Sequence, residues 1–589
     1  MPHTPSRIFP LSGLLSLGLL ALSGSTHAQV SLNVYRVGAD SACDYRTDDL
    51  PNALQAAIDD IPTSPPAGIQ FRIELANNGS YDNLKLQLLG RSVEIAGGFA
   101  NCAATAPSAT ATTLRANPAV NAPVLLIDGQ DQPDKHVVLR HLILSDASGT
   151  EARGLTVEDA HVDLFGVTVR DNQGATFGGG IRVLGTTARL GLYENSFVIE
   201  NRSSQDGGGI HCSRGATLFL DTASAVRSNE AAFNGGGIAI VGCTAYVNSG
   251  GHGLQATGYN VGFNTALQGG GISLSSLYAT APTRLILGKD VPASTARPQI
   301  MGNMATGLGG GILAMGEGTQ VEAYDTVFSS NQSGQQGGGL SVRNGATATI
   351  KRTHRQCAPA PHCSSFVDNT AVGGGAVGVG YDGSKAFIEG TWFKGNKATS
   401  NGAVYQALNG HSEIISQNNV LVKNEGPNII SISPTAESPN AASITLKQDT
   451  IARNTSGAST IATHSTGLLK MGRTLVSPGA GIAVVSGSPI GPAPQMHCNV
   501  LEGTLGVEHA DSLTTTDTVI NFVNAAADDF RPTSSSEAVD HCPAQAGYLA
   551  YDHNLVPRPV DSALPDIHGP FDAGAYEWNQ MLFWDGFEE

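Results

Sequence analysis

The chain has 589 residues and a formal net charge of −17, with 33 Lys and Arg against 50 Asp and Glu. This acidic balance, without a basic patch, argues against nucleic acid as a partner. Only 14% of the residues are charged and 6% are aromatic, whereas 72 are glycine. A compact globular protein of this length would normally divide into several domains. The composition therefore indicates a long, thin and repetitive molecule.

Residues 1–28 are predicted to be a signal peptide. Arg7 precedes an apolar run from Ile8 to Leu22, and Thr26-His27-Ala28 supplies small residues for cleavage before Gln29. The run is shorter than the roughly 18 clean apolar residues of a membrane anchor. We expect export, to the medium or to the outer-membrane surface of a Gram-negative bacterium, and no transmembrane span in the mature chain.

Residues 29–120 are expected to form an N-terminal cap and the first, less regular strands. Apolar residues recur at helical spacing between Thr47 and Ile61, namely Leu50, Leu54, Ile58 and Ile61. Thr47 and Asp48 are candidate caps of this helix. Strand-like pieces follow, beginning with Phe71 to Leu75. The pattern predicts an amphipathic helix that closes one end of the fold.

A repeat dominates the following region, residues 121–510. Ten asparagines recur 27 to 39 residues apart: Asn172, Asn201, Asn229, Asn264, Asn303, Asn331, Asn369, Asn396, Asn424 and Asn454. Three residues before each of them stands an apolar residue: Val169, Val198, Val226, Val261, Ile300, Phe328, Phe366, Phe393, Leu421 and Ile451. Ten matches at one offset indicate a structural repeat of about 28 residues.

Glycine clusters accompany these asparagines. They begin at Gly178, Gly207, Gly235, Gly269, Gly309, Gly337 and Gly373, with a worn copy at Asn401 to Val404. Apolar residues alternate after the first six clusters, which is typical of strands with one buried face. Short strands, glycine turns and no helical periodicity predict an all-β fold, a single-stranded right-handed parallel β-helix. In such a solenoid, stacked Asn side chains hydrogen-bond along the axis, so we interpret the asparagines as a structural ladder rather than a ligand site.

Insertions in the longer repeats are expected to form loops outside the coil. The clearest runs from Lys351 to Cys363, another lies within Ala279 to Pro298, and a third surrounds His252. Residues 511–589 are rich in Pro and Asp and have little periodicity. We expect them to form a C-terminal cap and a tail.

The eight cysteines are an even number in a chain predicted to reach an oxidising compartment, which favours disulfides. Their spacing does not resemble a zinc site. We expect neighbours to pair, although eight cysteines allow other connectivities. The expected pairs are Cys43 with Cys102, Cys212 with Cys243, Cys357 with Cys363, and Cys498 with Cys542.

The step Phe328-Ser329-Ser330-Asn331 and its copies, followed by Gly-Gly-Gly-Ile, resemble the repeats of polymorphic outer membrane proteins. More broadly, residues 165–455 resemble the pectate-lyase-like β-helix superfamily. Ile95 to Cys102 and Phe571 to Glu577 look like early and closing segments of secreted bacterial β-helix proteins. The resemblance implies a secreted or cell-surface protein. Unlike polymorphic outer membrane proteins, this chain is expected to lack an autotransporter barrel, because no series of about ten-residue alternating segments follows the repeat.

Enzymes of that superfamily act on polysaccharides with paired carboxylates, calcium, or an Arg or Lys base. Asp159, His161 and Asp163 alternate on one predicted strand, a spacing suited to acid–base work or to a cation such as calcium. His252 lies in a Gly-His-Gly sequence like that of polygalacturonases, but the accompanying motifs are absent. None of these patterns specifies calcium or another cofactor. An outer strand face is also charged in many proteins without a site.

The sequence is compatible with two functions. We favour a non-catalytic adhesion or interaction scaffold that contacts an extracellular glycan or surface protein. The alternative is a polysaccharide lyase or hydrolase that acts on acidic glycans along an exposed sheet face.

Overall fold

The computed structural model describes residues 31–578, apart from 51, 131, 133, 249–259, 293–295, 355–362, 434–441, 458, 465, 479–481, 488–491, 508–510, 512, 517, 545–548 and 560–565. The predicted signal peptide (1–28), His252 and Cys357 lie outside the described residues. Within those ranges, no helix has the length and apolarity that a membrane span requires.

The chain forms a parallel β-helix, the predicted fold class. One rung consists of β14 (Ile181–Leu184), β15 (Arg189–Tyr193), β16 (Phe197–Ile199) and β17 (Arg202–Asp206). The chain then returns to pair β18 (Ile210–Ser213) with β14 in parallel. The right-handed sense expected from the sequence is the one that connections between parallel strands normally take.

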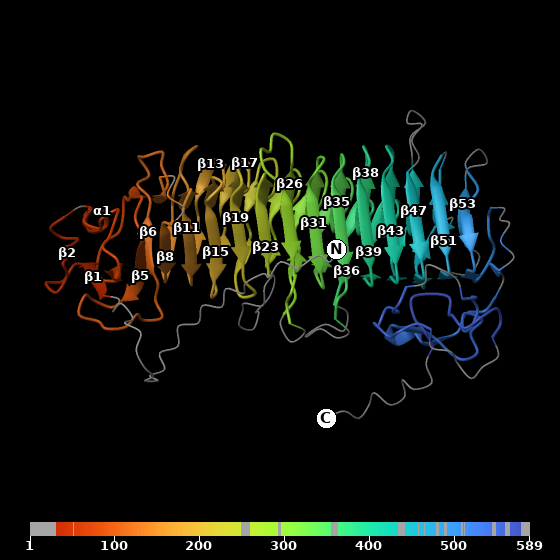
Figure 1. Ribbon diagram of the computed structural model, residues 1–589. Coiled ribbons are helices and arrows are strands. Elements are labelled where there is room, and N and C mark those ends of the chain that lie inside the picture. Colours follow the sequence, from red (N-terminus) through yellow and green to blue (C-terminus); the bar gives the residue numbers. More distant parts are fainter. Residues whose placement is uncertain are drawn as a thin grey trace, which may run out of the picture.

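Repetition of this rung builds four parallel sheets along a rod (Figure 1). Among the described residues, sheet I has 14 strands and runs from β4 (Leu86–Leu89) through β14 to β53 (Ala483–Gly487). Sheet II has 17 strands and contains β1 (Ser31–Gly38), β15 and β54 (Gln495–His497). Sheet III has 14 strands, from β6 (Thr112–Arg115) through β16 to β55 (Val500–Leu501), and sheet IV has ten, from β13 (Gln173–Phe177) through β17 to β49 (Thr455–Ser456).

The apolar residues that precede the asparagines form one buried row in sheet III. All ten are at most 1% exposed, and each pairs in register with its copy on the next rung. Within this row, the rings of Phe328, Phe366 and Phe393 stack with centroids 4.3 and 5.0 Å apart. The rod interior is therefore filled by like side chains over like side chains, about 4.8 Å apart.

The ten asparagines stand at the corner between sheets III and IV and form one continuous hydrogen-bonded row. The Nδ2 of each of the first nine donates to the Oδ1 of the next at 2.9–3.1 Å. Within the row, that oxygen also accepts the backbone N–H of the preceding asparagine, as in Asn303 to Asn331 at 3.1 Å. Each amide thus satisfies buried polar groups of the turn that it stabilises.

The glycine clusters form the corner between sheets IV and I. Gly207 has a φ of 68°, which favours glycine, and a Cβ on Gly208 would overlap the carbonyl oxygens of Glu230 and Gly236. The cluster at Gly373 is aligned one residue later than the sequence suggests. Leu340 pairs with Val377, and Gly374 has the positive φ of 58°.

The helix at the N-terminal end is shorter than predicted. Helix α1 spans Ala53–Asp59 and begins at the cap residue Asn52, so Thr47 and Asp48 do not cap it. The residue before a proline is disfavoured in helical conformation, which explains why the helix does not include Leu50, and this side chain is exposed. Leu54 and Ile58 are buried and continue the core of the first strands.

The stretch from Ala279 to Pro298, within which an inserted loop was expected, also contains a strand of sheet II. β26 (Ile272–Ser275) is followed by the loop 276–283 and then by β27 (Arg284–Leu287). Arg284 is followed by three consecutive buried apolar residues, so this strand lacks the alternation that marks a strand with one buried face.

Beyond β55 the chain turns back along the side of the rod (Figure 1). This C-terminal segment, residues 518–578, contains β56 (Phe522–Asn524), the 3₁₀ turn η1 (Ala525–Ala527) and β57 (Asp529–Pro532), and β56 pairs with β57 in antiparallel. It covers the outer face of sheet III, where Trp392, Val420, Val422 and Ala452 pack with Phe530, Ala575 and Tyr576.

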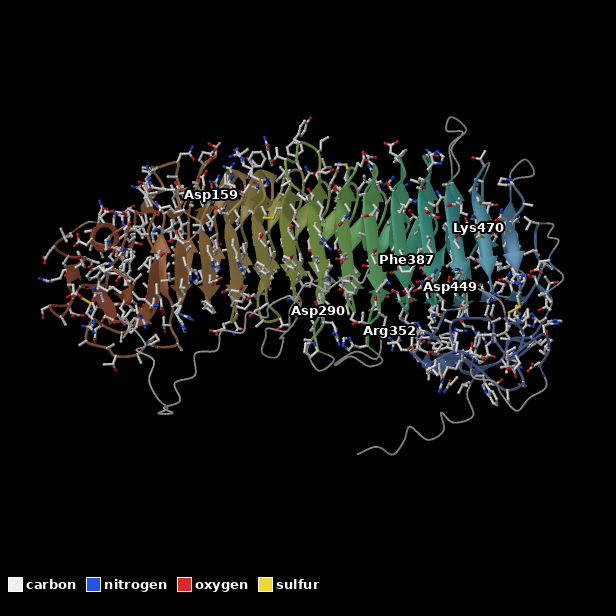
Figure 2. All side chains as sticks on the ribbon, in the orientation of Figure 1. Asp159, Asp290, Arg352, Phe387, Asp449 and Lys470 are labelled. Atoms are coloured by element: carbon white, nitrogen blue, oxygen red, sulfur yellow. A yellow bond between two sulfur atoms is a disulfide. The ribbon has the colours of Figure 1, made fainter. Side chains whose placement is uncertain are left out.

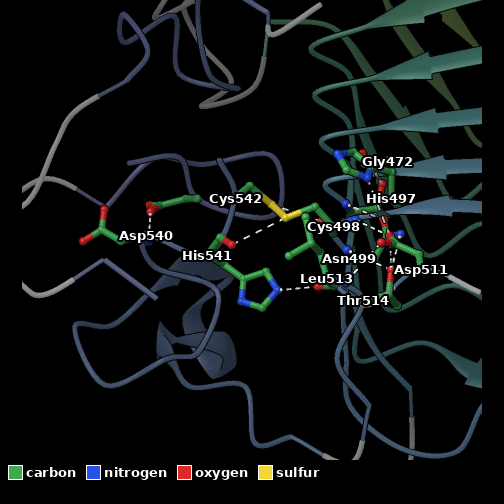
Figure 3. Close-up of a disulfide and its surroundings, with 12 residues drawn as sticks. Gly472, His497, Cys498, Asn499, Asp511, Leu513, Thr514, Asp540, His541 and Cys542 are labelled. Atoms are coloured by element: carbon green, nitrogen blue, oxygen red, sulfur yellow. Dashed lines mark hydrogen bonds and ion pairs between the residues drawn. A yellow bond between two sulfur atoms is a disulfide. The ribbon is translucent and has the colours of Figure 1, made fainter. Parts of the chain in front are cut away.

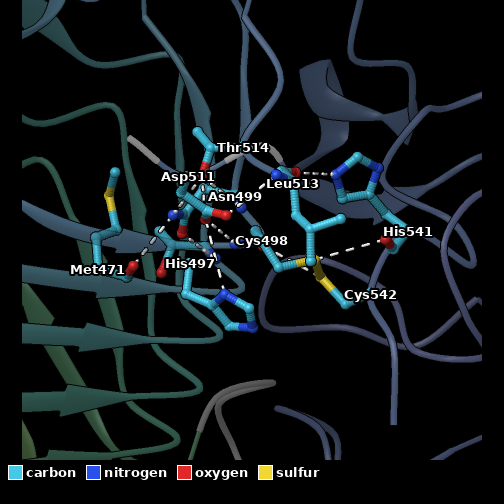
Figure 4. Close-up of polar contacts among 10 residues, drawn as sticks. Met471, His497, Cys498, Asn499, Asp511, Leu513, Thr514, His541 and Cys542 are labelled. Carbon is cyan, nitrogen blue, oxygen red and sulfur yellow. Dashed lines mark hydrogen bonds and ion pairs between the residues drawn. A yellow bond between two sulfur atoms is a disulfide. The ribbon is translucent and has the colours of Figure 1, made fainter. Parts of the chain in front are cut away.

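Disulfides join Cys43 to Cys102, Cys212 to Cys243, and Cys498 to Cys542. Cys363 is also disulfide-bonded. The Cys498–Cys542 bond ties the last rungs to the C-terminal segment (Figure 3). Beside it, Asp511 accepts hydrogen bonds from the backbone N–H of Cys498 at 2.7 Å and from the Thr514 hydroxyl at 2.9 Å, and Asn499 donates to the carbonyl of Met471 at 3.0 Å (Figure 4).

Candidate functional site

Two histidines and an aspartate converge on the outer face of sheet II. His136 opens β8 (His136–Arg140), and its register partner His161 opens β11 (His161–Phe165). Their rings stack with centroids 4.2 Å apart. The Nε2 of His136 lies 2.9 Å from Oδ2 of Asp163, and the Nε2 of His161 lies 3.2 Å from Oδ1. We call these three residues the His–His–Asp cluster.

The cluster is partly buried. The side chain of Asp163 is 14% exposed, and those of His136 and His161 are 44% and 29% exposed. Burial raises the pKa of Asp163, but hydrogen bonds from His136 and His161 outweigh it and hold this pKa well below its usual range. Gly191 lies beside the carboxylate, where a Cβ would come within 2.6 Å of Oδ1. The carboxylate is therefore ionised, and it shares the space over Gly191 with the ring of Tyr193.

Asp159 does not share the face of His161 and Asp163. It lies in the turn between β10 (Leu155–Glu158) and β11, with a φ of 46°, and accepts a hydrogen bond from the Thr187 hydroxyl at 3.0 Å. Figure 2 shows it at the upper edge of the rod. The sequence reasoning missed His136 because the early rungs lack the Asn and Gly landmarks that reveal which residues are stacked.

A groove crosses the outer face of sheet I, starting at the turn that contains Asp159. One part has a volume of about 650 Å³ and the adjoining part about 430 Å³. Phe177, His211, Val241 and Tyr278 line both parts. We call this depression the sheet I groove. One wall is the loop 276–283, where the Tyr278 side chain is 92% exposed.

His211 lies at the base of the sheet I groove, on β18. It is only 7% exposed, its ring lies 5.0 Å from that of Phe177, and its Nδ1 has no hydrogen-bond partner among the described residues. Burial, together with the charges of Arg182 and Arg153, lowers the pKa of His211 to about 3. The imidazole is therefore neutral at physiological pH and offers a buried polar atom to a ligand.

Charged side chains surround this imidazole. Arg182, on β14, lies 5.9 Å from the centroid of the Phe177 ring and 3.9 Å from the carboxylate of Glu151. Asp206 accepts hydrogen bonds at one oxygen from the backbone and side chain of Asn234, at 3.0 and 2.8 Å. Burial nevertheless raises the pKa of Asp206. The sheet I groove thus combines aromatic faces, a guanidinium, carboxyl groups and a neutral imidazole.

A third cavity, of about 510 Å³, lies between sheet III and the C-terminal segment. Its charges are already paired: Lys394 with Asp528 at 2.7 Å, and Arg531 with Asp529 at 2.6 Å. We interpret this cavity as part of the packing seam between the two regions.

Three carboxylates line the sheet I groove: Glu158 and Asp159 in one part and Asp206 in the other. Asp159 and Asp206 each bond to the neighbouring rung. The chain matches no protein-family model and no curated protein.

Proposed function

We propose that the protein is an exported, non-catalytic scaffold that binds an extracellular glycan in the sheet I groove. The observation that carries this proposal is the buried, unpartnered Nδ1 of His211 beneath the open groove between Phe177 and Tyr278. An unsatisfied polar atom in a concave site is costly unless a ligand or water meets it.

The lining supports a glycan as the ligand. A sugar ring packs its C–H face on an aromatic ring, such as Phe177 or Tyr278, while its hydroxyls bond to side chains such as His211. The guanidinium of Arg182 would pair with the carboxylate of a uronic acid. Because the groove lies open on the side of a rod and spans several rungs, it suits a chain of sugars better than an enclosed small molecule.

Export is supported by separate observations. The predicted signal peptide occupies residues 1–28, and three disulfides link described cysteines, as in proteins of oxidising compartments. The resemblance of the rungs to polymorphic outer membrane protein repeats agrees with a position at the cell surface or in the medium.

The test is a binding screen of the intact, disulfide-bonded protein against neutral and uronate-containing polysaccharides, with calorimetry on the best ligand. We expect the double variant Phe177→Ala/Tyr278→Ala to weaken binding at least about tenfold, since a well-packed aromatic contact contributes more than about 1 kcal/mol. Phe387→Ala is the matched control, because Phe387 is a half-buried aromatic on the outer face of sheet II (Figure 2). Failure of every glycan to bind, or full binding by the double variant, would overturn the proposal.

The second candidate is a polysaccharide lyase or hydrolase, favoured by the position of Asp159, Arg182 and a neutral His211 in one groove. Its test follows unsaturated products and reducing ends from each bound polysaccharide, with and without calcium. Turnover that is abolished by His211→Asn or Asp159→Asn would replace the scaffold by an enzyme.

A further inference from the structure

We propose that the His–His–Asp cluster binds a divalent transition-metal ion such as Zn²⁺. The three ligand atoms, Nε2 of His136, Nε2 of His161 and a carboxylate oxygen of Asp163, all lie within 4.8 Å of one another. This inference is independent of the proposed glycan function, because the cluster lies on sheet II and lines none of the described cavities.

The β-helix holds the ligands in place before any ion arrives. His136 and His161 are register partners on hydrogen-bonded strands, and Asp163 lies two residues after His161 on the same face. Both rings turn the same nitrogen toward the same carboxylate. An ion between them would need only small side-chain movements to reach the distances of about 2.0–2.2 Å that zinc adopts with nitrogen and oxygen.

The donor set selects the class of ion. Two imidazoles with one carboxylate suit zinc, copper, iron or nickel, whereas calcium prefers six to eight oxygen ligands. Each imidazole can offer one nitrogen lone pair to a cation, and the two rings are stacked 4.2 Å apart beside the same carboxylate. The exposure of His136 leaves the remaining coordination positions open to water or to a ligand from outside.

The register partners of the cluster define its surroundings. Asp163 pairs with the apolar Val138 on one side and with Gly191 on the other. The ring of Tyr193 occupies the space over Gly191, where an added Cβ would overlap Cε2 of that ring. His161 pairs with Arg189 on β15, so the three ligands stand on a rigid sheet beside an aromatic ring and an arginine.

The experiment uses untagged full-length exported protein, treated with EDTA, desalted and titrated with ZnCl₂ by calorimetry. We expect saturation at one Zn²⁺ per chain, and at least about tenfold weaker binding in each of His136→Gln and Asp163→Asn. His464→Gln is the matched control, because His464 is exposed and distant in the chain. Co²⁺ absorption adds a direct readout of the ligands: visible bands should appear in the wild type and in His464→Gln, and be lost in both cluster variants.

His136→Gln changes a residue at the sheet surface and should fold normally, which circular dichroism would verify. The proposal would be overturned if the wild type showed no saturable Zn²⁺ binding, or if both cluster variants bound Zn²⁺ as tightly as the wild type. The cluster would then be a hydrogen-bonded network only. Competition by Ca²⁺ as strong as that by Co²⁺ would contradict the assigned class of ion.

Discussion

The central rungs and the C-terminal segment are stabilised in different ways, although they pack against each other. From β14 to β49 a continuous row of buried, uncharged amides runs along the rod, each bonded to its copy on the next rung. Ionisable side chains such as Asp325 and Asp449 are also buried there, but they do not repeat from rung to rung. In the C-terminal segment the buried groups are charged and occur once: Arg558 donates to Glu577 at 2.5 Å, and both side chains are fully buried. Nearby, burial raises the pKa of Asp552 and Asp572.

The contacts that attach the C-terminal segment to the rod also occur once each. Arg558 also donates to the side chain of Asn418 at 3.2 Å, and Ala575 N–H donates to the Thr450 hydroxyl at 2.9 Å. A repeated interaction can be strengthened by stacking along the whole rod, whereas a single buried ion pair depends on both partners. We therefore expect the rungs to stay folded when the C-terminal segment is displaced. We expect the segment itself to unfold when one of its buried charges is removed.

The largest effect is expected from Gly338→Ala in the central rungs. A Cβ at this position would overlap the backbone carbonyl oxygens of Gly375 and Thr370, which no side-chain movement can relieve. We expect a loss of at least about 4 kcal/mol in unfolding free energy, measured by thermal and urea denaturation. Gly318→Ala is the control, because it meets nothing within 4 Å despite a φ of 80°, and should cost only about 1 kcal/mol. Equal effects would show that steric contact between rungs is not the cause.

Asn331→Ala should lower the unfolding free energy by about 3–4 kcal/mol. It removes the two hydrogen bonds that Nδ2 donates and the two that Oδ1 accepts within the buried row. Asn454→Ala, at the end of the row, should cost less, because no further asparagine follows and the residue is slightly exposed. Denaturation of both variants measures the difference. If the end variant were as destabilised as the middle one, stacking along the row would not be the source of stability.

Arg558→Leu should destabilise the C-terminal segment by about 3 kcal/mol, because Glu577 would remain buried without its cation. Limited proteolysis should then cut within residues 518–578 while circular dichroism of the rungs stays unchanged. Arg531→Leu, at a half-exposed pair with Asp529, should have a smaller effect. Unfolding of the rod together with the segment in Arg558→Leu would contradict the separation of the two regions.

The smallest effect is expected at Asp449, a charged residue inside the rod (Figure 2). Burial raises its pKa to about 7, although the backbone N–H of Asn419 and the Ser416 hydroxyl donate to it. The folded pKa lies above the unfolded value, so its contribution to stability is complete below about pH 4 and is lost as the pH rises through 7. Asp449→Asn should thus be neutral at pH 4 and stabilise by on the order of 2 kcal/mol at pH 9. Denaturation of both proteins across this range checks it, and a pH-independent difference would rule out titration of Asp449.

The same contrast explains what could be predicted from the sequence. The asparagine and glycine spacing predicted the parallel β-helix because every rung repeats the same physical requirement, so ten weak signals add up. The helix was predicted too long. The apolar spacing begins at Leu50, but a residue that precedes a proline is disfavoured in helical conformation, and α1 begins only at Ala53. Asp159 was predicted to share the face of His161 and Asp163. That prediction was wrong because Asp159 lies in the turn before β11 and not on the strand.

The site was harder to predict than the fold. His136 joins His161 only through the register of early rungs, which carry no landmark in the sequence. The sheet I groove depends on how the loop 276–283 lies beside β18, and a loop that occurs once leaves no periodic signal. For the same reason the ion pair of Arg558 and Glu577 was not anticipated.

The most direct test of the central claim is hydrogen–deuterium exchange with and without the glycan that binds best in the screen. Glycan bound in the sheet I groove should slow exchange in residues 176–186, 205–215 and 275–281, and leave sheet III and the C-terminal segment unchanged. Slowed exchange confined to the outer face of sheet II or to residues 518–578 would contradict it.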